Sequence, residues 1–192
     1  MVGGRYSFEA SQKELIARYR LKEADFNYGA KEEIYPTTVS PIILPDKKSA
    51  LLTWGFSPSF AKGPLINARG ESILEKPTFS KAFRTNRCLV PATSFFEWEK
   101  IGNHKEKRKI SVKDQSIFSI AGICDLFIDK NGKEVWMYSI ITTEANEAMK
   151  KIHDRMPVIL MPENEADYLD LNQDPKKVQQ LLRPFEKELS IV

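Results

Sequence analysis

From Arg87 onward the chain alternates short apolar runs with turn signals, and this pattern restricts the fold more than any other feature of the sequence. Candidate strands occur at residues 87–91, 95–100, 107–112, 117–127 and 135–142. Gly102-Asn103 and Asn131-Gly132 lie between neighbouring candidates and are typical of tight β-turns. Consecutive strands this close in sequence pair antiparallel. The pattern therefore predicts a meander that curls into a sheet or partial barrel.

Helix signals flank this β-rich region. Ser11 is a candidate N-cap for a helix over residues 11–20, with Glu14 as its capping-box partner. Asp174 followed by Pro175 predicts a helix start near the C-terminus. The other expected elements are extended chain at 1–8, strands at 39–44 and 51–56, a helix at 142–150 capped by Thr142 or Thr143, a helix at 162–171, and an end of the last helix near Leu182. We predict the α+β class: a single domain, residues 1–192, with a curled antiparallel β-sheet flanked by helices.

Charge and cysteine usage narrow the class of protein. A net charge of +3 permits a nucleic-acid groove without requiring one. Cys88 and Cys124 lie inside apolar runs, which indicates buried free thiols of a reducing compartment. No apolar run is long enough to span a membrane, and the start has no secretory pattern. We expect a soluble monomer that binds no membrane and lies in the cytoplasm, associated with the nucleoid if the source is bacterial.

Metal and cofactor motifs do not occur in the sequence. The two histidines and two cysteines lack the spacing of metal ligands. There is no Walker loop, no G-x-G-x-x-G and no G-x-S-x-G elbow. We therefore expect neither a metal nor a cofactor.

His153, within residues 151–160, is the first candidate for proton transfer. It follows the helix expected at 142–150 and directly precedes Asp154 and Arg155. A histidine held there by a neighbouring carboxylate can face a cleft, and its side chain is suited to move protons near neutral pH. The alternative is a capping or core-edge histidine beside a structural Asp-Arg pair.

Asn67, Arg69 and Glu71 form a second polar group after two apolar residues. Asn67 can both donate and accept hydrogen bonds, and Arg69 can clamp a phosphate through two donors. Glu71 could brace Arg69 or act itself. The alternative is a solvated loop with a surface ion pair.

Glu97 is a carboxylate between aromatic residues. On a strand, alternation separates Glu97 from its neighbours Phe96 and Trp98. A partly desolvated carboxylate has a raised pKa and can act as an acid or a base; the alternative is an exposed Glu on an antiparallel sheet. Trp54 and Trp98 could stack on bases or pack in the core.

His104 precedes a run of charged residues, Lys105 to Lys109. We interpret this stretch as a solvated hairpin loop. The alternative is that its charges contact a phosphate backbone.

Taken together and in order, several stretches resemble one family. Gly4-Arg5-Tyr6 is similar to the Cys-Gly-Arg-Phe/Tyr opening of SRAP (SOS-response-associated peptidase) proteins. The other matching motifs are Trp54-Gly55-Phe56, Asn67-Ala68-Arg69-Gly70-Glu71, Pro91-Ala92, Phe95-Phe96-Glu97-Trp98, Ala121-Gly122, Ile141-Thr142-Thr143 and His153-Asp154-Arg155-Met156-Pro157. The match spans about residues 4–185. One such motif is weak, but the ordered set is specific.

The resemblance implies an abasic-site processing protein with a compact α+β fold and a curled antiparallel sheet. Such proteins recognise abasic sites in single-stranded DNA and attach to them through the cysteine that becomes residue one after methionine removal. The α-amine of this cysteine attacks the sugar aldehyde, and its thiol closes a thiazolidine ring. An α-amine titrates near neutral pH, so much of it is a free nucleophile.

The resemblance also implies residue roles. By motif, Asn67, Glu97 and His153 match the active-site residues of the family. Glu97 would shuttle protons as the imine forms, His153 would assist ring opening and crosslink reversal, and Asn67 would orient the N-terminal residue or the sugar. The expected DNA-binding residues are Arg5, Trp54, Arg69, Trp98 and Arg155, with Arg69 on a phosphate. The same centre is thought to cleave the family's own leading methionine.

One departure from the family concerns the nucleophile. The chain starts Met1-Val2-Gly3-Gly4-Arg5 and has no cysteine there. Either Gly3 replaces the cysteine behind an extra Val2, or Val2 replaces it and Gly3 is inserted. A stable thiazolidine is therefore not expected, and the buried Cys88 and Cys124 are poor substitutes. An amine of Val2 or Gly3, freed by processing, could still form a hydrolysable Schiff base and lead to β-elimination, although one residue shifts its position by roughly 3.5 Å.

We predict an SRAP-type protein of the DNA damage (SOS) response, with peptidase- or lyase-like activity, that binds single-stranded DNA at abasic sites and crosslinks through its N-terminal residue. One alternative is a non-catalytic single-stranded DNA-binding module, with steep salt dependence and no response to the abasic sugar. Another is a peptidase acting on other polypeptides, although no Ser or Cys nucleophile stands beside His153 in a recognisable motif.

Overall fold

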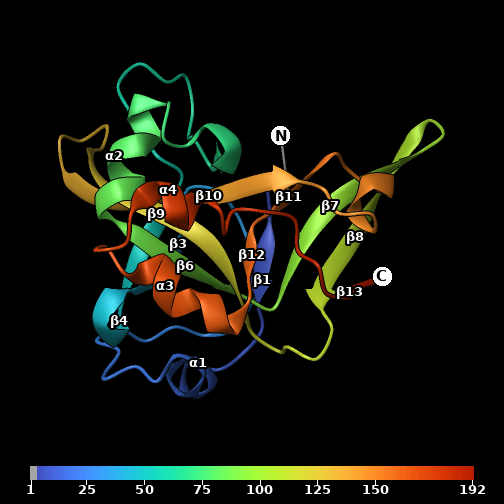
Figure 1. Ribbon diagram of the computed structural model, residues 1–192, viewed down its shortest axis with the longest axis horizontal. Helices are drawn as coiled ribbons and strands as arrows, with labels where there is room; N and C mark the ends of the chain where they lie inside the picture. The colour runs from blue at the N-terminus through green and yellow to red at the C-terminus, as the bar shows by residue number, and fades with distance from the viewer. Residues whose placement is uncertain (1–3) are drawn as a thin grey trace.

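The computed structural model describes residues 4–192. Within these residues, one sheet has five strands in the order β13 (Leu189–Ile191), β8 (His104–Val112), β7 (Ser94–Ile101), β1 (Tyr6–Phe8) and β2 (Lys31–Ile34). The other sheet has the order β11 (Arg155–Pro157), β10 (Glu134–Glu144), β4 (Lys48–Trp54), β3 (Val39–Leu44), β6 (Arg87–Ala92), β9 (Phe118–Ile128) and β12 (Ile159–Leu160), and β5 (Asn67–Arg69) pairs with β10 beside this path. Because β10 pairs with both β4 and β9, strands β10, β4, β3, β6 and β9 form a partial barrel (Figure 1).

The predicted fold class is confirmed, but the continuous meander predicted from Arg87 onward is wrong: β7 and β8 belong to the five-stranded sheet, and β6 pairs with β9 of the other sheet. Strands β6 to β10 follow one another, with antiparallel pairing of β7 with β8 and of β9 with β10. Gly102 (φ 59°) and Gly132 (φ 77°) hold the positive backbone angles that such hairpin turns require. The sequence did not predict that β4 and β5 would run parallel to β10.

Short helices flank the sheets (Figure 1). Helix α1 (Gln12–Tyr19) has the predicted capping box of Ser11 and Glu14, and α4 (Pro175–Gln179) is capped by Asp174 as predicted but ends before Leu182. The segment predicted as a helix at 162–171 forms a 3₁₀ turn and α3 (Glu165–Leu169). Helix α2 (Pro77–Thr85), which begins with a proline, was not predicted.

The predicted helix at residues 142–150 is wrong. Thr142 and Thr143 instead continue β10 and pair with Pro157 and Met156 of β11. Both threonines are β-branched, which favours a strand, and the only helical turn in this segment, Met149–Lys151, is a 3₁₀ turn. The correction matters because it places Thr142 beside the predicted functional residues.

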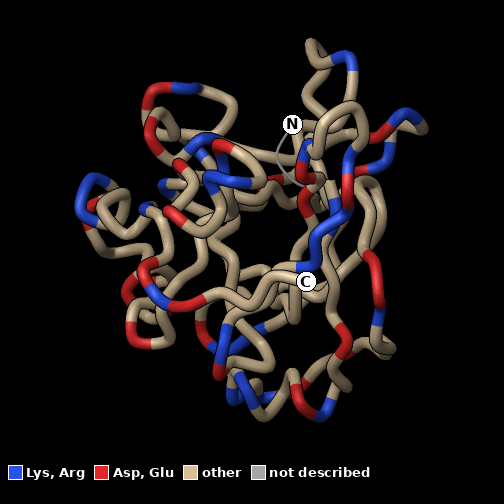
Figure 2. The backbone as a smooth tube through the Cα atoms, turned by 90° about the vertical axis from the view of Figure 1, so that its right-hand side faces the viewer, with Lys and Arg blue, Asp and Glu red and all other residues tan. Residues whose placement is uncertain are grey.

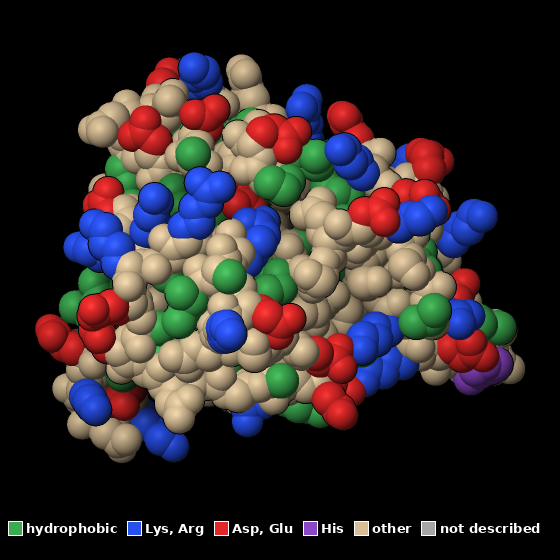
Figure 3. Space-filling model, turned by 90° about the horizontal axis from the view of Figure 1, so that it is seen from below, with side chains coloured by type: hydrophobic (Ala, Val, Ile, Leu, Met, Phe, Trp, Pro, Cys, Tyr) green, Lys and Arg blue, Asp and Glu red, His purple; other side chains and the backbone are tan. Residues whose placement is uncertain are grey.

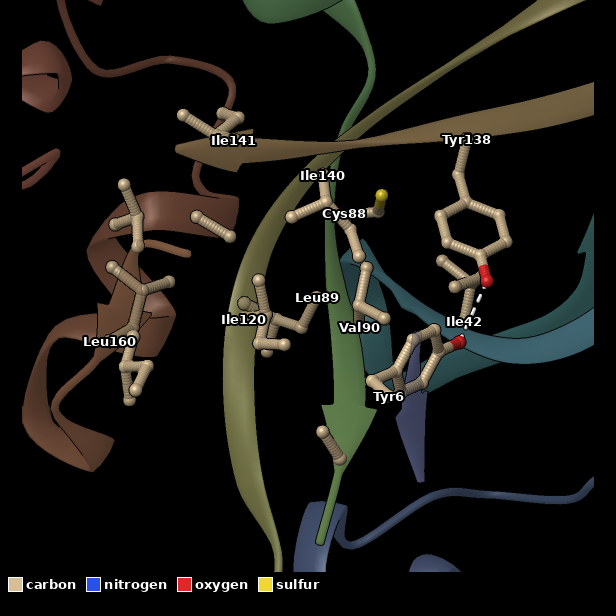
Figure 4. Close-up of a cluster of buried hydrophobic side chains, with 14 of the residues drawn as sticks. Tyr6, Ile42, Cys88, Leu89, Val90, Ile120, Tyr138, Ile140, Ile141 and Leu160 are labelled. Carbon is tan, nitrogen blue, oxygen red and sulfur yellow. Dashed lines mark hydrogen bonds between the residues drawn. The ribbon is translucent and has the colours of Figure 1, made fainter. Parts of the chain in front are cut away.

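A single hydrophobic core joins the two sheets. Tyr6 of β1 and Tyr138 of β10 are buried, and their hydroxyl oxygens lie 2.7 Å apart (Figure 4). Burial raises the pKa of both tyrosines, so the hydroxyls stay protonated. Trp54 packs edge-on against Tyr6 and stacks with Tyr138. Among residues 4–192, no helix has the length and apolar composition needed to cross a membrane.

Candidate active site

The end of β10 brings together two segments that lie far apart in the sequence. On one side β5 pairs with it in parallel, with Asn67 opposite Ile140 and Arg69 opposite Thr142. On the other side β11 pairs with it antiparallel, with Pro157 opposite Thr142. The two segments enclose a cavity of about 420 Å³ lined by Pro64, Leu65, Ile66, Asn67, Arg69, Thr142, His153, Asp154 and Arg155. Asn67 and His153, both predicted as catalytic, therefore share one cavity.

Glu97 lies next to this cavity. It belongs to β7 and is only 2% exposed. With Arg5, Tyr6, Asn67 and Thr142 it lines a smaller depression, of which Trp54, Phe95, Ile120, Ile140 and Pro157 form the rest. Since Asn67 and Thr142 line both spaces, the three predicted catalytic residues belong to one site. The alternative of an exposed Glu97 is excluded by its burial.

The N-terminal strand runs toward Glu97. Strand β1 pairs antiparallel with β7, with Tyr6 opposite Phe95, and the Phe96 N–H donates to the Arg5 carbonyl at 3.1 Å. In this register Gly4, the first described residue, lies on the Glu97 side of Arg5. The predicted nucleophile position, Gly3 or Val2, lies outside the described residues.

His153 is held through its Nδ1 atom. The side chain is 24% exposed, and Nδ1 lies 3.0 Å from the Asp154 carboxylate and 3.0 Å from the Arg155 backbone nitrogen. In a neutral ring, the Arg155 N–H donates to Nδ1 and the proton sits on Nε2. In the charged ring, Nδ1 can donate to Asp154 instead. These two contacts fix the orientation of the imidazole ring at the cavity wall.

Arg155 lines the cavity and forms an ion pair with Glu71, which lies in the turn that follows β5. Its Nη1 and Nη2 atoms donate to the two Glu71 carboxylate oxygens at 2.7 and 2.9 Å, and Nη2 also donates to Thr142 Oγ1 at 3.0 Å. Burial of the Glu71 carboxyl opposes its ionisation, but the hydrogen bonds and charge of Arg155 outweigh this, so the pKa of Glu71 lies below its usual value. The sequence suggested that Glu71 could brace Arg69; the structure pairs it with Arg155.

The other predicted DNA-binding residues differ in exposure. Arg69 is exposed at the cavity wall. Arg5 pairs with Glu33 at 3.0 Å and lies over the ring of the half-buried Trp98. The prediction that Trp54 contacts DNA bases is wrong, because its side chain is completely buried and its Nε1 donates to the Ile66 carbonyl.

Two features of the site were missed in the sequence. Thr142 was assigned to a helix cap, although it links the Glu97 side of the site to the His153 side. Phe60, in the loop that leads to the cavity wall, is 72% exposed. Its ring lies in solvent shortly before Pro64, a residue that lines the cavity, and the sequence alone does not show this exposure.

The charged hairpin at Lys105 to Lys109 is largely neutralised within the protein. Lys107 pairs with Glu33, Arg108 with Glu99 at 2.7 Å, and Lys109 with Glu9 at 2.6 Å. On the side of the molecule that faces the viewer in Figure 2, acidic and basic residues likewise lie close together along the backbone. They are also interspersed on the face seen in Figure 3. These pairings favour a solvated segment over a phosphate contact, but the predicted loop is wrong, because Lys105 to Lys109 belong to strand β8 and pair with β7.

Both cysteines are buried and free, as predicted. Burial raises the pKa of the Cys88 thiol well above its usual value, and the neighbouring Cys124 raises it further. A thiol of this kind is a poor nucleophile. Among residues 4–192, no three His, Cys, Asp or Glu side chains are grouped so that they could hold a metal ion.

The site consists of a buried carboxylate beside a cavity that is lined by an amide, a histidine and two arginines, and it lies at the end of a partial barrel. These features define the class of protein: an α+β protein with a compact polar site. A model described as "SOS response associated peptidase (SRAP)" matches residues 2–192. The chain belongs to this family.

Named relatives and solved structures agree with this assignment. The abasic site processing protein YoqW of Bacillus subtilis is 33% identical, over 96% of this chain and 88% of its own. The abasic site processing protein HMCES of Xenopus tropicalis is 29% identical, over 71% of this chain and 50% of its own. A crystal structure of a protein from Bacteroides thetaiotaomicron superposes with a TM-score of 0.87 at 29% identity, over 98% of this chain and 90% of that one.

Proposed function

We propose that this protein processes abasic sites in single-stranded DNA at the cavity beside Glu97. The observation that carries the proposal is the convergence of Asn67, His153 and the buried Glu97 on one site, toward which the N-terminal strand runs. The names of relatives such as YoqW, an abasic site processing protein, support the same activity.

The cavity suits a sugar that has lost its base. Its volume of about 420 Å³ is at the small end of ligand sites, and its polar lining suits an aldehyde and hydroxyl groups. Arg69, exposed at the wall, is placed to hold an adjacent phosphate. Phe60 offers a ring on which a neighbouring base can stack, which requires that base to be unpaired and so favours single-stranded DNA.

The reaction begins at an N-terminal amine, supplied by Val2 or Gly3 once the residues before it are removed. The amine nitrogen attacks the aldehyde carbon of the open sugar and forms a carbinolamine. Water then leaves as the carbon–nitrogen double bond forms. Glu97 accepts the proton released by the amine and returns it to the departing hydroxyl, a general acid–base role. Asn67 orients the sugar by hydrogen bonds.

The product in this chain is an imine. A cysteine at the same position would add its thiol to the imine carbon and close a thiazolidine; the chain has none at its start. The imine is hydrolysed by water or loses the 3′ phosphate by β-elimination. His153 moves protons in these later steps, with Asp154 as the partner of its charged form.

The same centre is proposed to remove the leading methionine. The peptide bond that is cut precedes the residue that becomes the nucleophile, so one general base can serve both reactions. Glu97 would activate the attacking water. We place this chemistry in the cytoplasm, at the nucleoid of a bacterial cell, and propose that the protein acts as a single-domain monomer.

The test uses a single-stranded oligonucleotide with one abasic site, resolved on a denaturing gel. This chain is compared with a version restarted as Met-Cys-Gly-Arg-Tyr, each with and without borohydride. We expect a heat-stable adduct from the restarted version alone, and an adduct from this chain only with borohydride, which reduces the imine. An undamaged strand is the control. No adduct in either version would refute the proposal and leave a non-catalytic DNA-binding module.

A further inference from the structure

The ion pair between Glu71 and Arg155 has the geometry of a phosphate contact. Two parallel N–H donors of one guanidinium meet two oxygens of one carboxylate, at 2.7 and 2.9 Å. Arginine binds phosphate groups in the same paired arrangement. The Glu71 carboxylate therefore occupies the edge of Arg155 that a DNA phosphate would use.

The guanidinium of Arg155 has no other edge at which two N–H donors could bind a phosphate. Its Nε is buried and has no hydrogen-bond partner among residues 4–192, so the edge formed by Nε and an Nη atom faces protein. One Nη2 hydrogen is used by Thr142 Oγ1 at 3.0 Å. A phosphate that is to bind Arg155 through two donors must displace Glu71.

Displacement is feasible because the two partners differ in exposure. The Arg155 side chain is 13% exposed and is anchored on Thr142, whereas the Glu71 side chain is 44% exposed. The Glu71 backbone is held separately, by Gln179 of α4. The carboxylate can thus swing into solvent while the guanidinium stays in place.

We propose that Glu71 is a specificity-determining residue that keeps Arg155 from binding the backbone of undamaged single-stranded DNA. An undamaged strand gains one phosphate contact but loses the ion pair, so its net gain is small. A strand with an abasic site adds the contacts of the sugar inside the cavity and so can offset the loss. The inference rests on the proposed function, because it takes single-stranded DNA as the ligand.

The test measures the affinity for an undamaged single-stranded oligonucleotide over a range of salt concentrations, by fluorescence anisotropy. Since partly exposed ion pairs are weak, we expect Glu71→Gln to bind about fivefold more tightly than the parent chain. The slope of log affinity against log salt should steepen by about 0.7, the value for one added phosphate contact on a single strand.

Two control variants make the result specific. Glu134→Gln removes the same charge at the far end of β10 and should leave the slope unchanged. In an Arg155→Gln background, Glu71→Gln should produce no gain. Melting temperatures of all variants check the fold, and Glu71→Ala, which cannot hydrogen bond to Arg155, is a second variant with the same expected gain.

The inference is overturned if both Glu71 variants bind undamaged DNA as weakly as the parent chain, or if the gain persists without Arg155. Its failure can be told from that of the proposed function, which the borohydride adduct tests. An adduct without the affinity gain would refute the proposed role of Glu71 and leave the abasic-site chemistry in place. A gain without any adduct would support the role of Glu71 and refute the abasic-site chemistry.

Discussion

Replacing Gly55 by alanine tests how the barrel positions the cavity wall. Gly55 has a φ of +111°, and a Cβ there would lie 2.7 Å from Pro64 Cβ and 3.3 Å from Ile66 Cγ2. The backbone cannot move away easily, because the Gly55 N–H donates to the Tyr138 carbonyl at 2.7 Å and Phe56 pairs with Leu65. The substitution therefore strains the backbone and pushes on the segment that leads into Asn67.

The magnitude has two parts. A non-glycine residue at such a φ costs about 1–3 kcal/mol, and overpacking adds about 1–3 kcal/mol. We expect Gly55→Ala to lower the free energy of unfolding by about 3 kcal/mol. In a chain of this size each kcal/mol lowers Tm by about 2–4 °C, so Tm should fall by about 10 °C.

Thermal unfolding followed by circular dichroism measures the effect. Gly63→Ala is the matched control, because this glycine lies in the same loop and a Cβ there would meet nothing within 4 Å. Its Tm should stay within about 2 °C of the parent chain. A Tm for Gly55→Ala that also stays within that range would refute the reasoning, since neither the backbone angle nor the contact with Pro64 would then matter.

Three other outcomes follow from the structure. Glu97→Gln should slow formation of the borohydride-trapped adduct by about a hundredfold or more with little change in Tm, whereas Glu99→Gln should leave the rate unchanged. Arg87→Met removes three donors to backbone carbonyls, each at 2.6–2.7 Å and two of them buried, and urea unfolding should show a loss of about 3–5 kcal/mol. The depressed pKa of Glu71 means that its ion pair stabilises the fold above the ordinary carboxyl pKa and is lost as pH falls through the depressed one. The Tm difference between the parent chain and Glu71→Gln should therefore persist at pH 5 and vanish in stronger acid.

Local patterns predicted much of the fold. The capping box of Ser11 and Glu14, the cap at Asp174 and the turn at Gly132 each depend on neighbours within a few residues, and the sequence contains that information. Strand β3 has the predicted bounds, 39–44, because its apolar run is flanked in the sequence by residues that interrupt regular secondary structure.

The features that the sequence did not predict depend on pairing between strands that lie far apart in the chain. Thr142 has signals for a helix cap, but β5 and β11 both pair with the end of β10, and this pairing overrides the local preference. The short β5 has no strand signal of its own and exists only because β10 is beside it. The partner of Glu71 was likewise set by the strand order, which places Arg155, not the nearby Arg69, against its carboxylate.

The candidate site was predicted in part. Asn67, Glu97 and His153 were named from motifs, and the structure brings them together. Trp54 was misassigned because a motif does not reveal whether a tryptophan faces solvent or the core, and its burial follows from packing against Tyr6 and Tyr138.

The attachment point between protein and DNA tests the central claim most directly. The adduct trapped by borohydride on an abasic oligonucleotide would be digested with protease and nuclease, and the modified residue located by mass spectrometry. We predict that the sugar remnant is carried by the α-amine of the N-terminal peptide. A remnant on a lysine side chain, with an unmodified N-terminal peptide, would contradict the proposal that the N-terminal amine reacts beside Glu97.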